Sequence, residues 1–63
     1  MMNREECIAV KCFAYLWLDH EYEDIVFCRV TVEDLYRGEF TAKNREEAIE
    51  IFKSGEWKNR IAS

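Results

Sequence analysis

The stretch Cys12-Phe13-Ala14-Tyr15-Leu16-Trp17-Leu18 contains no charged side chain, no glycine and no proline. Large apolar side chains occupy both its even and its odd positions, and successive side chains of a β-strand project to opposite faces of a sheet. A strand of this composition therefore needs an apolar covering on both sides. A chain of 63 residues builds one small core, because a domain of about 60 residues buries only about 60% of the surface that its unfolded chain exposes. The stretch predicts that one face lies in the core and that the other is left over.

The composition is that of one ordered globular domain, residues 1–63. Hydrophobic residues make up 49% of the chain and proline is absent, whereas disordered chains have few apolar residues. The net charge of −4 disfavours binding to a nucleic-acid backbone or to an anionic membrane. The longest apolar run is far shorter than the about 20 residues of a membrane span, and the acidic N-terminus is unlike a secretory leader. We therefore expect a cytoplasmic protein.

The cysteines Cys7, Cys12 and Cys28 cannot all pair within one chain. An odd count with no CxxC pair is typical of a reducing compartment and of thiols that pack as small apolar side chains. The sequence predicts no disulfide, no metal site and no cofactor.

Composition and alternation predict an α+β fold with a small antiparallel three-stranded sheet, made of a hairpin and an edge strand. Residues 7–18 and 25–32 are rich in β-branched and aromatic side chains and are expected to form the hairpin, joined by the polar residues 19–24. Residues 36–42 alternate between polar and apolar positions, which is typical of a half-buried edge strand.

A C-terminal helix is predicted over residues 44–55, packed on one face of the sheet. Asn44 is a favourable N-cap, and Gly55 follows the last turn. The apolar side chains of the helix form one arc, which is wide enough to cover a single face. Residues 56–63 are expected to add a turn of helix or a last strand.

The register of the hairpin follows from the wholly apolar positions of its strands, which should share the core face. We expect Leu18 to lie opposite Val26. The other face then has four opposed pairs: Trp17 with Phe27, Tyr15 with Arg29, Phe13 with Thr31, and Lys11 with Glu33.

The face left over is the candidate binding surface, and it is expected to carry Phe13, Tyr15, Trp17, Phe27 and Arg29. Aromatic residues and arginine are enriched at protein interfaces and at their energetic centres. The sequence therefore predicts a protein partner on this face. Two alternatives stay open: the C-terminal segment folds across the rings of this face, or two copies stack these faces as a homodimer.

The acidic loop is expected to form a second contact, through Asp19, Glu21, Glu23 and Asp24. Its carboxylates could occupy a basic surface of a nucleic-acid-handling partner, where phosphates would otherwise lie. The single histidine, His20, lies in the same loop and is interpreted as a solvated residue. Because no titratable groups are gathered into a site, we predict no catalytic residue and no enzyme.

The run Asp34-Leu35-Tyr36-Arg37-Gly38-Glu39-Phe40-Thr41, followed by Glu46-Glu47-Ala48, resembles the strand-to-helix passage of HicB-type antitoxins. It lacks the proline that this family has before the glycine. In size and charge the chain is also similar to phage-encoded inhibitors such as anti-CRISPR proteins. The resemblances imply a small inhibitor or antitoxin-like regulator from a phage or bacterium.

The sequence thus predicts a non-catalytic protein-binding module that blocks its partner sterically. The alternatives are a structural homodimer with no other activity and a binder of single-stranded nucleic acid, whose bases would stack on the aromatic rings. The acidic net charge opposes the last of these.

Overall fold

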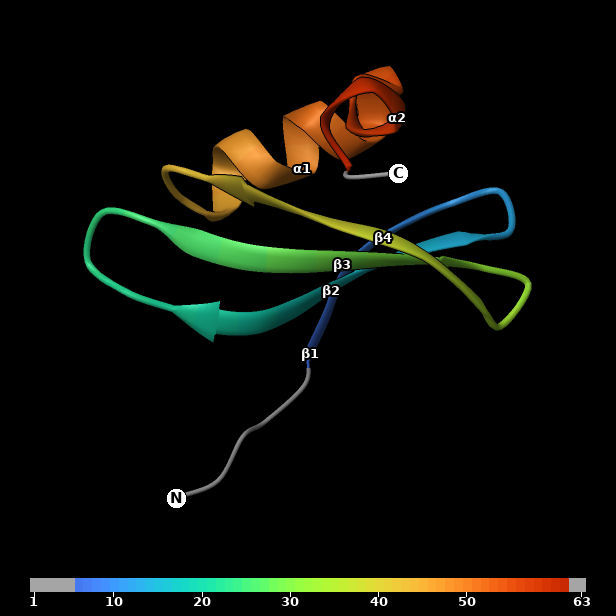
Figure 1. Cartoon of the computed structure of the whole chain (residues 1–63), viewed down its shortest axis with the longest axis horizontal. Coiled ribbons are helices and arrows are strands. Elements are labelled where there is room, and N and C mark those ends of the chain that lie inside the picture. The colour runs from blue at the N-terminus through green and yellow to red at the C-terminus, as the bar shows by residue number, and fades with distance from the viewer. Residues whose placement is uncertain (1–5, 62–63) are drawn as a thin grey trace.

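The computed structural model describes residues 6–61, which form a four-stranded antiparallel sheet and two helices (Figure 1). The elements follow the chain as β1 (Glu6–Lys11), β2 (Ala14–Glu21), β3 (Val26–Val32), β4 (Leu35–Ala42), α1 (Arg45–Ser54) and α2 (Trp57–Arg60). The strands lie in the order β1-β2-β3-β4, so that each strand pairs with its neighbour in sequence. The α+β class is confirmed, whereas the expected three-stranded sheet is wrong by one strand.

The additional strand arises because the predicted strand over residues 7–18 is a hairpin. The chain reverses at Cys12 and Phe13, and Lys11 pairs with Ala14 across this turn. Cys12 has a φ of 57°, a left-handed conformation that is uncommon for residues other than glycine, asparagine and aspartate. The reversal makes β2 an inner strand, with β1 on one side and β3 on the other.

The predicted register between the next two strands is also wrong. Leu18 lies opposite Cys28, two residues from the expected Val26. The strand β2 continues through Glu21, which pairs with Val26, and a β-bulge lies between Leu18 and His20. Because the pairing moves by two residues and side chains alternate with a period of two, residues 14–18 and 26–32 keep their predicted faces.

The opposed pairs change accordingly. Trp17 lies opposite Arg29, and Tyr15 lies opposite Thr31. The expected pairs of Trp17 with Phe27, Tyr15 with Arg29, Phe13 with Thr31 and Lys11 with Glu33 do not form.

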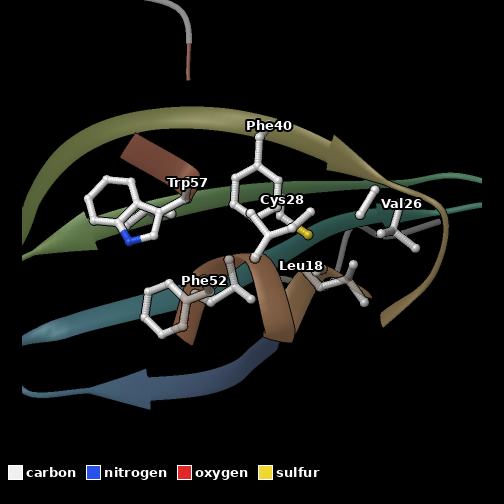
Figure 2. Close-up of a cluster of buried hydrophobic side chains, with 11 residues drawn as sticks. Leu18, Val26, Cys28, Phe40, Phe52 and Trp57 are labelled. Atoms are coloured by element: carbon white, nitrogen blue, oxygen red, sulfur yellow. The ribbon is translucent and has the colours of Figure 1, made fainter. Parts of the chain in front are cut away.

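The core lies between the sheet and α1 (Figure 2). Its buried side chains come from β2, β3, β4 and both helices: Leu16, Leu18, Val26, Cys28, Val30, Phe40, Ala42, Ala48, Ile51, Phe52 and Trp57. The helix forms as predicted, with Asn44 accepting a hydrogen bond from the Glu47 N–H and Gly55 adopting a left-handed φ of 88° at the C-cap. Burial of its one apolar arc stabilises the helix on the sheet.

The segment after α1 joins the same layer. Trp57 is buried, with its ring centroid 6.5 Å from that of Phe52, and Ile61 packs against Gly38 of β4. The expectation of a further turn of helix is confirmed by α2, and the alternative in which Trp57 and Ile61 cover Trp17 is wrong. Both helices therefore lie on one face of the sheet (Figure 1).

Candidate protein-binding face

The face of the sheet that points away from α1 and α2 is called the outer face below. Directly opposed residues of antiparallel strands project to the same side, so the strand pairing assigns its side chains. They are Cys7, Val10, Tyr15, Trp17, Asp19, His20, Phe27, Arg29, Thr31, Tyr36, Glu39 and Thr41. No helix or strand within residues 6–61 covers this face (Figure 1).

Trp17 lies at the centre of the outer face and is held by three neighbours. Its Nε1 donates a hydrogen bond of 2.9 Å to Thr31 Oγ1, and the guanidinium carbon of Arg29 lies 5.5 Å from its ring centroid. The Tyr15 ring stacks beside it at 6.4 Å. These contacts satisfy the only polar atom of the indole and place a cation over the ring, an arrangement that is favourable electrostatically. Trp17 is therefore half-buried and fixed in orientation.

Arg29 is fixed in turn by Asp19. The Nη2 and Nε atoms of Arg29 lie 3.2 and 3.4 Å from the two carboxylate oxygens of Asp19. Alternation along β2 places Asp19 on the same face as Trp17, and the β-bulge at this point brings the next residue, His20, to that face as well. Asp19 was expected in a solvated acidic loop, and the structure instead places it in β2 as the partner of Arg29.

A second aromatic group surrounds Phe27. The rings of His20 and Tyr22 meet the Phe27 ring edge-on, with centroids 6.4 and 5.8 Å away. Phe27 is 40% exposed and Tyr22 is 57% exposed. His20 and Tyr22 were not among the predicted site residues, because a polar loop gave no sign that β2 continues to Glu21. Aromatic side chains at 20 and 22, with the spacing of one strand face, were the available signal.

A shallow hollow of about 450 Å³ lies between the Phe27 group and β4. It is lined by Asp19, His20, Phe27, Cys28, Arg29, Glu39, Phe40 and Thr41. An aromatic wall beside two carboxylates and a guanidinium suits a side chain with both an apolar stem and a polar end. The outer face therefore offers an apolar contact area and a polar recess next to it.

Other predicted site residues lie elsewhere. Phe13 is 68% exposed in the β1–β2 turn and does not join the aromatic side chains of the outer face. Glu21 binds Arg45 of α1 at 3.2 Å, and this hydrogen bond is the main reason that the pKa of Arg45 is raised. Glu23 and Asp24 are exposed in the β2–β3 turn. The predicted acidic loop is thus divided among three environments.

The three cysteine thiols lie in different environments. Burial, followed by the nearby charge of Asp19, raises the pKa of the Cys28 thiol to about 11, so this thiol is neutral and unreactive at ordinary pH. Cys7 and Cys12 are exposed free thiols. Between residues 6 and 61, no three side chains of the metal-binding types lie together.

Comparison with protein-family models, with curated proteins and with solved structures gives no match to this chain. The resemblance of residues 34–48 to HicB-type antitoxins therefore has no support from a family model. Neither described helix has the length and hydrophobicity needed to cross a bilayer. A functional assignment must rest on the outer face itself.

Proposed function

We propose that the protein is a non-catalytic binding module that occludes a partner protein with its outer face. The observation that carries the proposal is the open aromatic surface around Trp17. Tyr15 and Phe27 remain 39% and 40% exposed, although the chain has two helices whose apolar side chains could have covered them. Both helices pack on the opposite face.

The rings of the outer face are also held in place before any partner binds. Trp17 is fixed by Thr31 and Arg29, and Arg29 by Asp19. Binding to such a surface loses little side-chain entropy, which favours affinity. Trp, Tyr and Arg are the residues that contribute most at interface centres. A small inhibitor or regulator of cytoplasmic enzymes or of nucleic-acid-handling proteins needs only such a binding surface, fixed before its partner arrives.

Steric occlusion is the mechanism that fits a module of this size. A standard interface buries about 800 Å² on each partner, and one face of a four-stranded sheet can supply such an area. The carboxylate of Glu39 beside the aromatic rings favours a partner surface with an exposed arginine or lysine. The net charge of −4 opposes the alternative of a single-strand nucleic-acid binder, because phosphates would be repelled.

Differential capture tests the proposal. The double variant Tyr15→Ser, Phe27→Ser removes two exposed rings from the outer face and leaves the contacts of Trp17 with Thr31 and Arg29 in place. The matched control, Phe13→Ser with Leu35→Ser, removes two apolar side chains that are 68% and 62% exposed at the turns. We expect the outer-face variant to lose at least tenfold in affinity for a protein captured by the wild type from bacterial lysate, and the control to retain it.

Equal capture by the wild type and the outer-face variant would discard the proposal. Two further measurements separate the alternatives. A structural homodimer would appear in sedimentation as a species that stops at two chains and is lost in the outer-face variant. A salt-dependent shift of labelled oligo-dT would instead support nucleic-acid binding.

A further inference from the structure

The two ends of the sheet differ in the features that they present. The β2–β3 turn lies at one end, and the β1–β2 and β3–β4 turns lie together at the other (Figure 1). At 3.3 Å per residue, the seven residues of β3 separate these ends by about 20 Å. Each end presents a feature that the outer face does not use.

One end carries a hollow of about 450 Å³, called the basic hollow below. It is lined by Lys11, Cys12, Phe13, Ala14, Val32, Arg37, Trp57 and Lys58. The lining contains three cations and no carboxylate. The acidic residues Glu33 and Asp34 lie in the adjacent β3–β4 turn and do not line it.

The three cations come from three different elements and are only partly engaged. Lys11 of β1 donates a hydrogen bond to the carbonyl oxygen of Lys53, and the Lys58 ammonium of α2 lies 5.8 Å from the Trp57 ring centroid. Arg37 of β4 makes no ion pair with any residue between 6 and 61. The basic hollow therefore retains positive charge next to the exposed ring of Phe13.

The opposite end carries the acidic tip, defined as Tyr22, Glu23 and Asp24. The turn is held by a hydrogen bond of 2.9 Å from the Tyr22 N–H to the Ile25 carbonyl oxygen. Both carboxylates are exposed, and neither has an ion-pair partner within residues 6–61. Tyr22 adds an exposed aromatic edge.

We infer that the acidic tip of one copy docks in the basic hollow of a second copy. The two features match in charge, with two carboxylates against three cations, and in apolar content, with Tyr22 against Phe13. A volume of about 450 Å³ is within the range of about 300–1,000 Å³ that holds a compact ligand. A turn of four residues can present its two carboxylates to such a space.

The contact joins different surfaces of the two copies, so it is heterologous. Because the acidic tip and the basic hollow lie at opposite ends of the molecule, pairing leaves one of each unoccupied and permits further growth. The contact leaves Tyr15, Trp17 and Arg29 of the outer face uncovered, and a row of copies would present them repeatedly to a partner. Self-association of this kind is independent of the proposed function.

Sedimentation of neutralised variants tests the inference. We expect the average mass of the wild type to rise above 7.6 kDa with concentration at low ionic strength, and the association to weaken at least tenfold at high salt. Arg37→Gln with Lys58→Gln removes charge from the hollow, and Glu23→Gln with Asp24→Asn removes it from the tip. Each double variant alone should remain monomeric.

An equimolar mixture of the two double variants is the decisive sample. It contains one intact hollow and one intact tip, so it should form dimers and nothing larger. The inference is overturned if the wild type stays monomeric at millimolar concentration, if a neutralised variant associates like the wild type, or if the mixture stays monomeric. Circular dichroism verifies that each variant is folded, and the single substitutions Lys58→Gln and Asp24→Asn replace a double variant that is not.

A single substitution on the outer face separates this inference from the proposed function. Tyr15→Ser should associate as the wild type does, because Tyr15 belongs to neither the tip nor the hollow, whereas Phe27 contacts Tyr22 of the tip. If its association is lost while the neutralised variants still associate, copies meet through the outer face and the head-to-tail contact is wrong.

Discussion

Cys28 shows how one buried residue connects the core to the outer face. Its side chain, in β3, is fully buried in the core. The carboxylate of Asp19, in the neighbouring strand β2 and on the outer face of the sheet, is nevertheless close enough to contribute to the rise of its pKa. The two effects act in the same direction, since both low polarity and a neighbouring negative charge disfavour a thiolate. The thiol therefore stays neutral and packs in the core like an apolar side chain.

The raised pKa of Cys28 predicts a loss of stability at alkaline pH. The ordinary pKa is 9.0 and the folded value is about 11, so between these values the unfolded chain releases a proton that the folded chain retains. The unfolded state then binds fewer protons, and the free energy of unfolding falls as pH rises from 9 towards 11. Urea titrations should show a steeper fall for the wild type than for Cys28→Ala.

Cys12→Ala is the matched control, because Cys12 is exposed. Its pH dependence should parallel that of the wild type. Parallel curves for the wild type and Cys28→Ala would show that Cys28 is not protected from ionisation.

At the scale of elements, two residues of the β3–β4 turn adopt an unfavourable backbone conformation that substitution can relieve. Glu33 and Asp34 have φ values of 54° and 68°, and Val32 pairs with Leu35 across them. Two positive φ values in a two-residue hairpin loop favour Asn-Gly. We expect Glu33→Asn with Asp34→Gly to raise the free energy of unfolding by about 1 kcal/mol, because glycine adopts this conformation without the penalty of a Cβ atom.

The β2–β3 turn offers an identical pair of residues as the control. Glu23→Asn with Asp24→Gly changes the charge equally, but neither residue has a positive φ. This variant should be neutral or less stable than the wild type in the same urea titration. Equal stabilisation of both turns would mean that charge, and not backbone conformation, is responsible.

The elements that the sequence predicts well are those with signals at both ends. The helix has an N-cap at Asn44, a C-cap at Gly55 and one apolar arc between them, and the structure confirms it. The reversal at Cys12 has no glycine, asparagine or proline to mark it, so the apolar stretch was interpreted as one strand. No residue type near His20 predicts the β-bulge that precedes it, and the register error follows from this missing signal.

The candidate site was predicted in part for the same reasons. The structure brings Tyr15, Trp17, Phe27 and Arg29 to one face, because a register error of two residues preserves the alternation of side chains. Phe13 is lost from this face because it lies in the unpredicted turn. The contacts among the remaining residues depend on the true register, and no pattern in the sequence specifies it.

At the scale of the whole molecule, the chain covers one face of its sheet and no more. The apolar arc of α1, the Trp57 ring and Ile61 all pack on the same side. Small domains have little apolar surface to distribute, so a second layer over the outer face is beyond the reach of residues 6–61. The open aromatic face is a consequence of this allocation, and the proposed binding function depends on it.

Proton–proton nuclear Overhauser effects from the two tryptophans of the isolated protein test this allocation most directly. The structure predicts contacts from Trp57 to Phe52, contacts from Trp17 to Tyr15, and none from Trp57 or Ile61 to Trp17. Cross-peaks that join the Trp57 or Ile61 side chain to the Trp17 ring within a monomer would contradict it. The outer face would then be closed by the chain itself.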